Sequence, residues 1–196
     1  MFSLVGNMKF ITLDQNYIKE LHNACSEVYY KPSNYDDKPY FGILLNTNGR
    51  TYAIPLSSAK NKHKTWKNIN QECYLVYEYA QKSKIGENSI WTETDDPNIV
   101  KHILSVIDIK KMIPVKEGTY SVVNLNKTSF DTLNEIKYKD LLNKEYSFCL
   151  KNIDSIIAKA SKLYAHQIAT GKVKKFCCDF RMLENVCDNY KVAVLV

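Results

Sequence analysis

The segment Ser57-Ser58-Ala59-Lys60, with His63 three residues later, places two hydroxyls and an ammonium close together in the chain. Such groups can hold a phosphate, because hydroxyls donate hydrogen bonds to its oxygens and lysine supplies positive charge. They can also promote RNA cleavage, since the 2′-hydroxyl of RNA is a built-in nucleophile. The protein then has to align the backbone, transfer protons and neutralise the charge of the transition state.

The role of Lys60 in such a site follows from the acidity of lysine. Lysine has an ordinary pKa of about 10.4, so at neutral pH it suits charge stabilisation or proton donation better than proton abstraction. The same short segment is also typical of a polar turn after a strand, where serine and lysine are common. The residues alone leave both interpretations open.

Positive charge is concentrated in two stretches that contain no Asp or Glu. The chain has 196 residues and a formal net charge of +6. Residues 38–71 carry six basic side chains and residues 155–178 carry five, so the remainder is net acidic. Two such stretches favour RNA or DNA as a partner. Two solvated, lysine-rich surfaces would give the same pattern.

Composition and motifs exclude several other classes of protein. Hydrophobic residues make up 45% of the chain and charged residues 24%, as in soluble globular proteins. No apolar run is long enough to span a membrane, and the N-terminus lacks the features of a signal peptide, so we expect a cytoplasmic protein. The six cysteines lack the spacing of metal ligands, and we interpret them as reduced, apolar side chains. We expect no metal ion and no cofactor.

The clearest local signal is a β-hairpin. Two apolar, β-prone runs at residues 40–46 and 50–56 flank Thr47-Asn48-Gly49, and Asn and Gly both tolerate the positive φ of a tight turn. Pro55 cannot donate to a ladder, so the second strand is predicted to end there or to lie at an edge. The return of the hairpin brings Lys38 and Tyr40 to the same end of the sheet as Ser57.

Periodicity and capping residues predict the other elements. We expect strands over residues 8–13, 73–79, 104–115 and 119–125, with a helix as the alternative for 73–79. We expect helices over 16–29 after an Asp14 cap, from Asp96-Pro97 to about 103, two within 131–170 that end at Gly171, and one from an Asp179 cap through 190.

The order of these elements predicts the class of fold. Strands followed by helices indicate an α+β protein, with a compact twisted antiparallel sheet or a partly closed barrel and helices packed on it. The chain has no internal repeat and no low-complexity linker, so we expect a single domain over residues 1–196.

Several segments resemble those of a known family. They are Met8-Lys9-Phe10, residues 38–43, residues 52–60 with His63, and residues 107–114, together with Gly171-Lys172, Cys178-Asp179-Phe180 and Leu183-Glu184 in the C-terminal part. These segments resemble the ToxN/AbiQ endoribonuclease toxins of type III toxin–antitoxin systems over residues 8–190. The CptN branch is the most similar.

The resemblance implies a MazF/Kid-like core and a bacterial, cytoplasmic toxin. It implies metal-independent cleavage of mRNA and of the precursor of its own antitoxin, leaving a 2′,3′-cyclic phosphate and a 5′-hydroxyl. It implies inhibition by a small repeat RNA antitoxin, a pseudoknot, that the toxin processes and holds in a closed toxin–RNA assembly. It also implies a role in abortive infection by phage.

Matching positions assign the catalytic set, which is Ser57, Ser58 and Lys60, with Lys38 and Tyr40 beside them. The acid-free basic stretches supply most of a hypothesised RNA-binding set, to which the family pattern adds Tyr35. This set comprises Tyr35, Lys62, His63, Lys64, Lys159, Lys162, Lys172, Lys174 and Lys175. The chain has Ala59 where the family often has proline, and the family's upstream tyrosine matches Tyr35 only after a shift of one residue. Residues 82–96 have no counterpart in the family pattern.

Two rival functions fit the same residues. A non-catalytic RNA-binding module would use the basic surfaces without cleaving RNA. A structural interaction protein would have no affinity for RNA.

Overall fold

The computed structural model describes the chain except residues 5, 7, 31–41, 48, 68–71 and 193–196, and residues 42–46 are described as backbone only. The elements in chain order are β1 (Ser3–Leu4), β2 (Ile11–Leu13), α1 (Gln15–Ala24), β3 (Gly42–Thr47), β4 (Arg50–Ser58), the 3-10 helix η1 (Asn61–Thr65), β5 (Cys73–Gln81), η2 (Lys82–Lys84), β6 (Ile90–Glu93), β7 (Ile99–Asp108), η3 (Ile109–Lys111), β8 (Ile113–Val115), β9 (Tyr120–Val122), α2 (Leu133–Lys151), α3 (Ile153–Thr170) and α4 (Phe180–Asn189). The predicted α+β class is confirmed.

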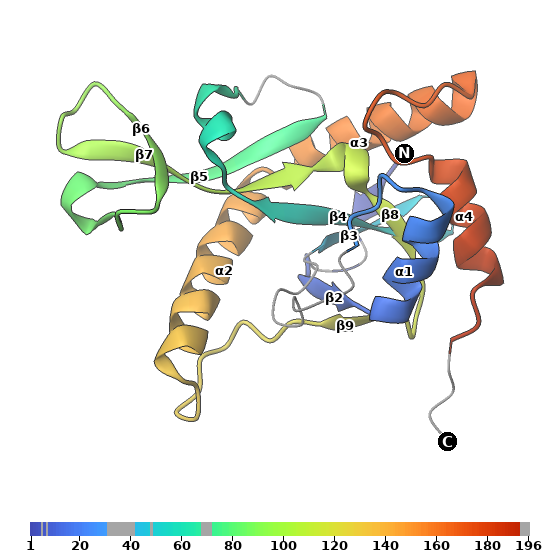
Figure 1. Cartoon of the computed structure of the whole chain (residues 1–196), viewed down its shortest axis with the longest axis horizontal. Coiled ribbons are helices and arrows are strands. Elements are labelled where there is room, and N and C mark those ends of the chain that lie inside the picture. The colour runs from blue at the N-terminus through green and yellow to red at the C-terminus, as the bar shows by residue number, and fades with distance from the viewer. Residues whose placement is uncertain (5, 7, 31–41, 48, 68–71, 193–196) are drawn as a thin grey trace.

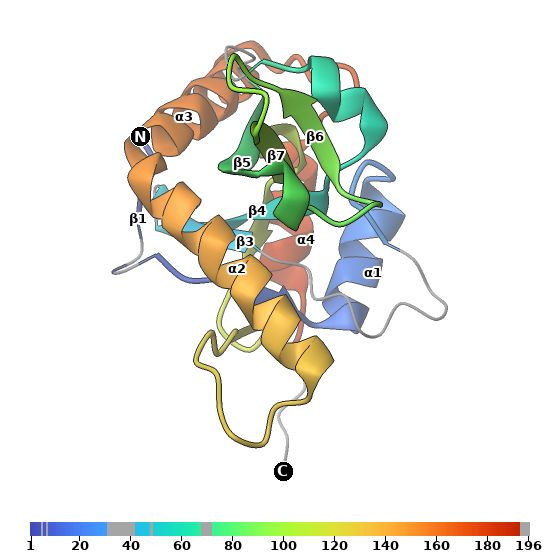
Figure 2. The same ribbon diagram turned by 90° about the vertical axis from the view of Figure 1, so that its left-hand side faces the viewer.

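Two antiparallel sheets form the β part of the molecule (Figures 1 and 2). The larger has the order β1-β3-β4-β7-β5, with β6 added on β7 and β8 on β4. The smaller pairs β2 with β9. Among the described strands the order does not return to its start, so they form no closed barrel.

The predicted hairpin is present as β3 and β4. Thr47 pairs with Arg50, and Gly49 has φ of +76°, so the two-residue tip needs the conformational freedom of glycine. The prediction that the second strand ends at Pro55 or lies at an edge is wrong. Strand β4 continues to Ser58 and lies between β3 and β7. Pro55 lies where the partner of β4 on one edge changes from β8 to β7, and this break in the ladder tolerates a residue without an N–H.

The prediction of a helix from Asp96-Pro97 is wrong. The Asp96 carboxylate accepts the Asn98 N–H at 2.8 Å, and its carbonyl accepts the Ile99 N–H at 3.1 Å, which closes a turn. The β-branched residues that follow pair with β5 over the length of β7. The single strand predicted over residues 104–115 is divided by η3 into β7 and β8.

Capping residues place the helices correctly. Asp14 accepts the Tyr17 N–H at 2.8 Å, and Asp179 accepts the Met182 N–H at 3.1 Å. Gly171 ends α3 with φ of +68°. The helix predicted to reach residue 29 ends at Ala24, and the strands predicted over 8–13 and 119–125 are reduced to β2 and β9. Residues 73–79 lie in a strand, β5.

The main hydrophobic core lies between the larger sheet and the helices. Tyr17, Ile54, Ile107 and Phe180 are among its fully buried side chains. The Tyr17 hydroxyl donates to the Pro114 carbonyl at 2.8 Å and so ties α1 to β8. Helices α1 and α4 lie side by side at one end of the sheet, whereas α2 runs beneath β5 (Figure 1).

A polar cluster holds the beginning of β4 against α3 and α4. The hydroxyls of Tyr52 and Tyr164 donate to the same Glu184 oxygen at 2.5 and 2.7 Å. Arg50 forms a two-bond ion pair with Asp188. Burial and the Glu184 carboxylate raise the pKa of both tyrosines, so the phenols remain donors. This strand is therefore anchored at its start.

Strands β5, β6 and β7 extend beyond the body of the molecule at the left of Figure 1. We call residues 77–103 the arm. Residues 82–96, which the family resemblance left unplaced, form η2, β6 and the turns at its tip. A second, smaller hydrophobic cluster lies at its base and contains Cys73, Leu75, Ile103 and Val106, with Ala59, Trp66, Tyr77 and Ile90 packed against it.

Candidate active site at the end of strand β4

Ser57 and Ser58 are the last two residues of β4, and both are exposed. In the antiparallel pairing with β7, Ser57 lies opposite Val106 and Ser58 lies opposite Ser105. Successive side chains of a strand point to opposite faces of the sheet. Ser57 is therefore on the face of the second cluster, Ser58 is on the face of Ser105, and together they present hydroxyls on both sides of the strand end.

Lys60 follows the strand and immediately precedes η1, and its side chain is exposed. The Lys60 N–H donates to His63 Nδ1 at 2.9 Å, and the His63 N–H donates to the Lys60 carbonyl at 2.8 Å. His63 is only 4% exposed and its ring centre lies 4.6 Å from that of Trp66. These contacts fix the Lys60 backbone, and they leave little of the His63 ring exposed.

The pKa of His63 is lowered by burial, and further by the charges of Lys62 and Lys60. The neutral ring is therefore the form that accepts the Lys60 N–H. In the unfolded chain the ring takes up its proton near the ordinary pKa of 6.5. Because the pKa of His63 is lower in the folded protein, the neutral ring contributes stability to the fold above pH 6.5. This contribution is lost as the pH falls through the folded-state pKa of His63.

We therefore expect the wild-type protein to lose stability between pH 7.5 and 5.5 by more than a His63→Gln variant does. The difference should be about 1 kcal/mol, the usual net value of one buried hydrogen bond. Urea unfolding of both proteins at the two pH values measures it. Parallel losses in the two proteins would contradict this role for His63.

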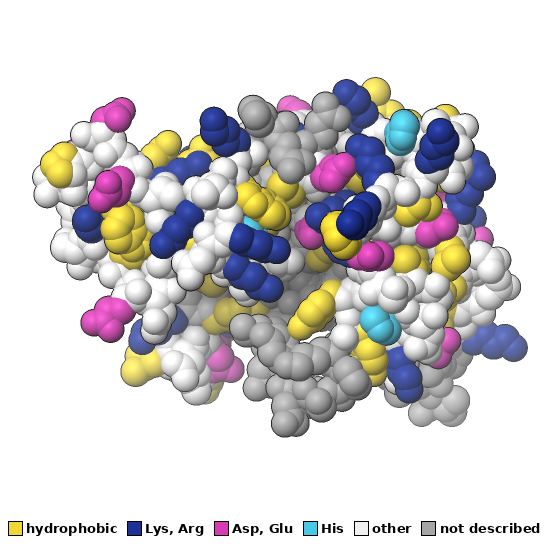
Figure 3. Space-filling view, turned by 45° about the horizontal axis from the view of Figure 1, so that its top comes forward, with side chains coloured by type: hydrophobic (Ala, Val, Ile, Leu, Met, Phe, Trp, Pro, Cys, Tyr) yellow, Lys and Arg dark blue, Asp and Glu magenta, His cyan; other side chains and the backbone are white. Residues whose placement is uncertain are grey.

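Basic side chains from separate segments meet at the start of β5. The Lys159 ammonium lies 3.4 Å from the Cys73 carbonyl and 4.4 Å from the centre of the Tyr74 ring, and its pKa is lowered by burial. Lys174 donates to Glu72 at 3.0 Å. We call Lys62, Lys110, Lys159 and Lys174 the basic surface. Figure 3 shows lysines and arginines spread over this side of the molecule.

The other predicted RNA-binding lysines are exposed. Lys64 lies on η1 beside Lys62, Lys162 lies on α3, and Lys172 and Lys175 follow that helix. The structure thus brings residues 159 and 174 close to β5, while the remaining lysines extend the charged area around them. Lys38, Tyr40 and Tyr35 lie outside the described residues.

Asp108 is a further candidate residue of this site, and no motif in the sequence indicates it. It lies two residues beyond Val106 on β7, so it shares a face with Ser57. Burial raises its pKa, and the charges of Lys110, Lys111 and Lys62 oppose that rise. One of its carboxyl oxygens is buried and has no hydrogen-bond partner among the described residues. Only strand pairing, and no local motif, places this carboxyl beside the site.

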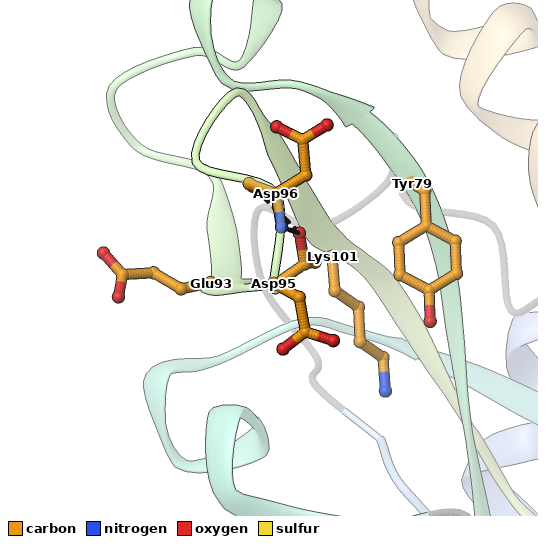
Figure 4. A pocket seen from close by; sticks show the side chains of 6 residues that line it. Tyr79, Glu93, Asp95, Asp96 and Lys101 are labelled. Carbon is orange, nitrogen blue, oxygen red and sulfur yellow. Dashed lines mark hydrogen bonds between the residues drawn. The ribbon is translucent and has the colours of Figure 1, made fainter.

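The arm carries the opposite charge. Glu93, Asp95 and Asp96 surround an open hollow of about 450 Å³, with Lys101 and Tyr79 on its other side (Figure 4). Acidic side chains also stand out on the left of Figure 3, where the arm lies. The acidic side chains of this hollow outnumber its one lysine, whereas the basic surface is positively charged.

Two further observations concern the described part of the chain as a whole. Among the described residues, no three His, Cys, Asp or Glu side chains are grouped so that they could hold a metal ion. Within the same part of the chain, no helix is long and apolar enough to cross a membrane.

Comparison with known proteins identifies the family. The family described as toxin ToxN of type III toxin–antitoxin systems matches residues 9–188. The endoribonuclease ToxN of Bacillus thuringiensis subsp. kurstaki is 29% identical over 193 residues, covering 94% of this chain and 85% of the relative. The endoribonuclease ToxN of Pectobacterium atrosepticum is 28% identical over 179 residues, or 90% of each chain.

A solved structure supports the same relationship. It comes from work on type III toxin–antitoxin systems and selective toxin inhibition by a non-coding RNA pseudoknot. It shares 26% identity with this chain, has a TM-score of 0.69, and covers 94% of this chain and 98% of its own. The family resemblance seen in the sequence is confirmed, and the chain belongs to the ToxN family of type III toxins.

Proposed function

We propose that this protein is an endoribonuclease toxin that cleaves RNA at the end of β4. Family membership and the two endoribonuclease relatives support the activity. The observation that carries the location is the joint exposure of Ser57, Ser58 and Lys60 at the end of a strand whose middle is buried and whose start is anchored by Arg50 and Tyr52. A rigid strand end is the kind of support that a phosphate site needs.

In the proposed reaction Ser57 and Ser58 donate hydrogen bonds to the scissile phosphate. The 2′-hydroxyl of the substrate loses its proton as its oxygen attacks phosphorus in line with the 5′-oxygen, the bond from phosphorus to the 5′-oxygen breaks, and that oxygen gains a proton and leaves as a 5′-hydroxyl. The product end is a 2′,3′-cyclic phosphate. Lys60 neutralises the extra charge of the transition state, and Lys38 and Tyr40 position the backbone or transfer protons. We assign no metal ion or cofactor to these steps.

The charge distribution suggests the path of the RNA. We propose that the RNA chain passes over Lys62 and Lys64 to reach the end of β4. The proposed RNA contacts away from the reacting phosphate are Lys159, Lys162, Lys172, Lys174 and Lys175. RNA phosphate would replace Glu72 as the partner of Lys174. The acidic hollow of the arm keeps the strand away from that end of the molecule.

The partners in this proposal are RNAs. The substrates are mRNA and the precursor of a repeat RNA antitoxin, and the processed pseudoknot inhibits the toxin within a closed toxin–RNA assembly. The inhibited toxin described for the related structure supports this choice. We further propose a role in abortive infection in the bacterial cytoplasm, a single domain over residues 1–196, a MazF/Kid-like core, membership of the CptN branch and RNA contact by Tyr35.

The test is incubation of the purified protein with total RNA in EDTA, followed by mapping of the new ends. We expect cleavage that leaves cyclic phosphates, and none from Ser58→Ala. Ser121→Ala is the matched control, because Ser121 is an exposed strand serine on β9, remote from the site. Retained RNA affinity without new ends in the wild type would favour the RNA-binding module. Cleavage by Ser58→Ala at the wild-type rate would place the site elsewhere.

A further inference from the structure

Phe176 lies in the loop between α3 and α4, within the acid-free stretch of residues 155–178 (Figure 1). Its backbone has φ of +63°, and among the described residues it is the only one other than glycine with a positive φ. A bulky side chain is disfavoured in this conformation, because its Cβ crowds the backbone carbonyl. Glycine at this position would allow the same turn without that strain.

Burial in the core does not offset this strain. Phe176 is 57% exposed, and it belongs to neither hydrophobic cluster of the described residues. The two residues that follow it, Cys177 and Cys178, are buried. Strained backbone conformations are concentrated at binding and catalytic positions. An exposed aromatic ring on a strained backbone therefore points to a contact with a partner molecule.

The turn that carries the ring is held on its C-terminal side. The Cys177 N–H donates to the Lys174 carbonyl at 3.1 Å, and the Cys178 N–H donates to the Lys110 carbonyl at 2.9 Å. The second bond joins the loop to η3, where Lys110 of the basic surface lies. A ring on a fixed turn loses little conformational freedom when a partner binds, which favours affinity.

The side chains around the ring are positively charged. The Lys175 ammonium lies 4.9 Å from the centre of the Phe176 ring, Lys172 is exposed, and Lys174 belongs to the basic surface. A single-stranded nucleic acid fits this combination, because its bases stack on aromatic rings while its phosphates pair with lysines. An apolar protein segment would use the ring but leave the lysines without a counter-charge.

We propose that Phe176 stacks on an unpaired nucleobase of the bound RNA, while Lys172, Lys174 and Lys175 contact the flanking phosphates. This inference rests on the proposed function for its RNA partner, and it adds a contact to a base. Every base has a flat face that can stack on the ring, but a base in a continuous duplex is already stacked on both sides. The contact therefore selects single-stranded RNA without selecting a sequence.

The test measures the affinity of a labelled single-stranded RNA by fluorescence anisotropy, with Ser58→Ala in every protein so that the RNA stays intact. We expect Phe176→Ala to bind about 5 to 150-fold more weakly, the effect of losing one stacked base. Phe176→Trp should bind at least as tightly as the protein with phenylalanine, because indole also stacks. The slope of log K against log salt should not change, since no phosphate contact is lost.

Two comparisons separate stacking from other effects of the change. Phe130 is 94% exposed on the loop before α2, at the opposite end of the molecule from the loop between α3 and α4 (Figures 1 and 2), so Phe130→Ala should not weaken RNA binding. Inorganic polyphosphate has the charge of RNA but no bases, and Phe176→Ala should not weaken its binding. Equal weakening of RNA and polyphosphate would mean that the ring only positions the lysines, and would overturn the proposal.

This inference and the proposed function can fail separately. If Phe176→Ala binds RNA as tightly as the protein with phenylalanine, the stacking contact is overturned, although cleavage by the wild type would still support the ribonuclease. If the wild type cleaves no RNA but Phe176→Ala loses RNA affinity as expected, the stacking contact is supported in an RNA-binding module.

The backbone strain has its own readout. Phe176→Gly should unfold at a higher urea concentration than Phe176→Ala, because only glycine adopts the positive φ without cost, and neither variant has the ring. Equal or lower stability of the glycine variant would contradict the strain, and with it the argument that the ring is retained for binding.

Discussion

Replacing Lys60 by alanine is expected to slow RNA cleavage by about 10² to 10³-fold, the usual effect of removing one preorganised group that stabilises transition-state charge. The Lys60 side chain is exposed beside Ser58, while its backbone is held by His63. Truncation therefore removes the ammonium and leaves the loop in place. RNA binding should change little, because most of the proposed phosphate contacts lie elsewhere. Single-turnover cleavage of a labelled RNA, with the enzyme in excess, measures the rate.

Two comparisons make this result specific. Lys84→Ala removes an exposed lysine from a similar short helix on the arm and should cleave at the wild-type rate. Expression in cells gives an independent readout, since the Lys60→Ala protein should no longer impair growth. An undiminished growth defect, with the variant present at wild-type levels, would show that this lysine is not essential.

Binding of single-stranded RNA is expected to weaken about 100-fold between 50 and 200 mM salt. If five lysines contact phosphates, log K should fall with log salt at a slope of about −3.5. The five are Lys159, Lys162, Lys172, Lys174 and Lys175. Fluorescence anisotropy of a labelled RNA with the Ser58→Ala protein measures affinity without cleavage. A slope near zero would remove the argument for a polyanion site.

A triple variant separates these contacts from general attraction. Lys162, Lys172 and Lys175 are exposed, and their replacement by alanine should reduce the slope by about 2 because each phosphate contact contributes about 0.7. A matched loss of three positive charges on other elements, from Lys9, Lys19 and Lys84, should leave the slope unchanged. Equal effects of the two triple variants would mean that only the net charge matters.

Local sequence signals predicted the parts of the fold that depend on neighbours in the chain. The Asn48-Gly49 tip and the caps at Asp14, Asp179 and Gly171 follow from conformational preferences of single residues. The Asp96-Pro97 helix failed because strand pairing of the following residues prevailed over a helix start that is also a good turn. Such pairing is a long-range interaction that no short window contains.

The same distinction holds for the candidate site. Lys60 lies in the loop predicted after the hairpin, whereas Ser57 and Ser58, predicted in the same loop, are the exposed last residues of β4. Asp108 could not be found in the same way, because the strand pairing of β7 places it on the face of Ser57. The interpretation of the cysteines as apolar side chains agrees with the burial of five of them. That interpretation did not predict that the sixth cysteine, Cys25, is partly exposed.

The second hydrophobic cluster links the stability of the arm to that of the loop that carries Lys60. Ala59 and Trp66 pack into the same small group of side chains as Tyr77 and Ile90 of the arm. Local opening of the arm therefore removes packing partners from the loop that carries Lys60. The free energy of local unfolding of the arm is thus coupled to that of the loop. Such a coupling is reciprocal, so RNA that orders the loop would protect arm amides from hydrogen exchange at a distance from every phosphate it touches.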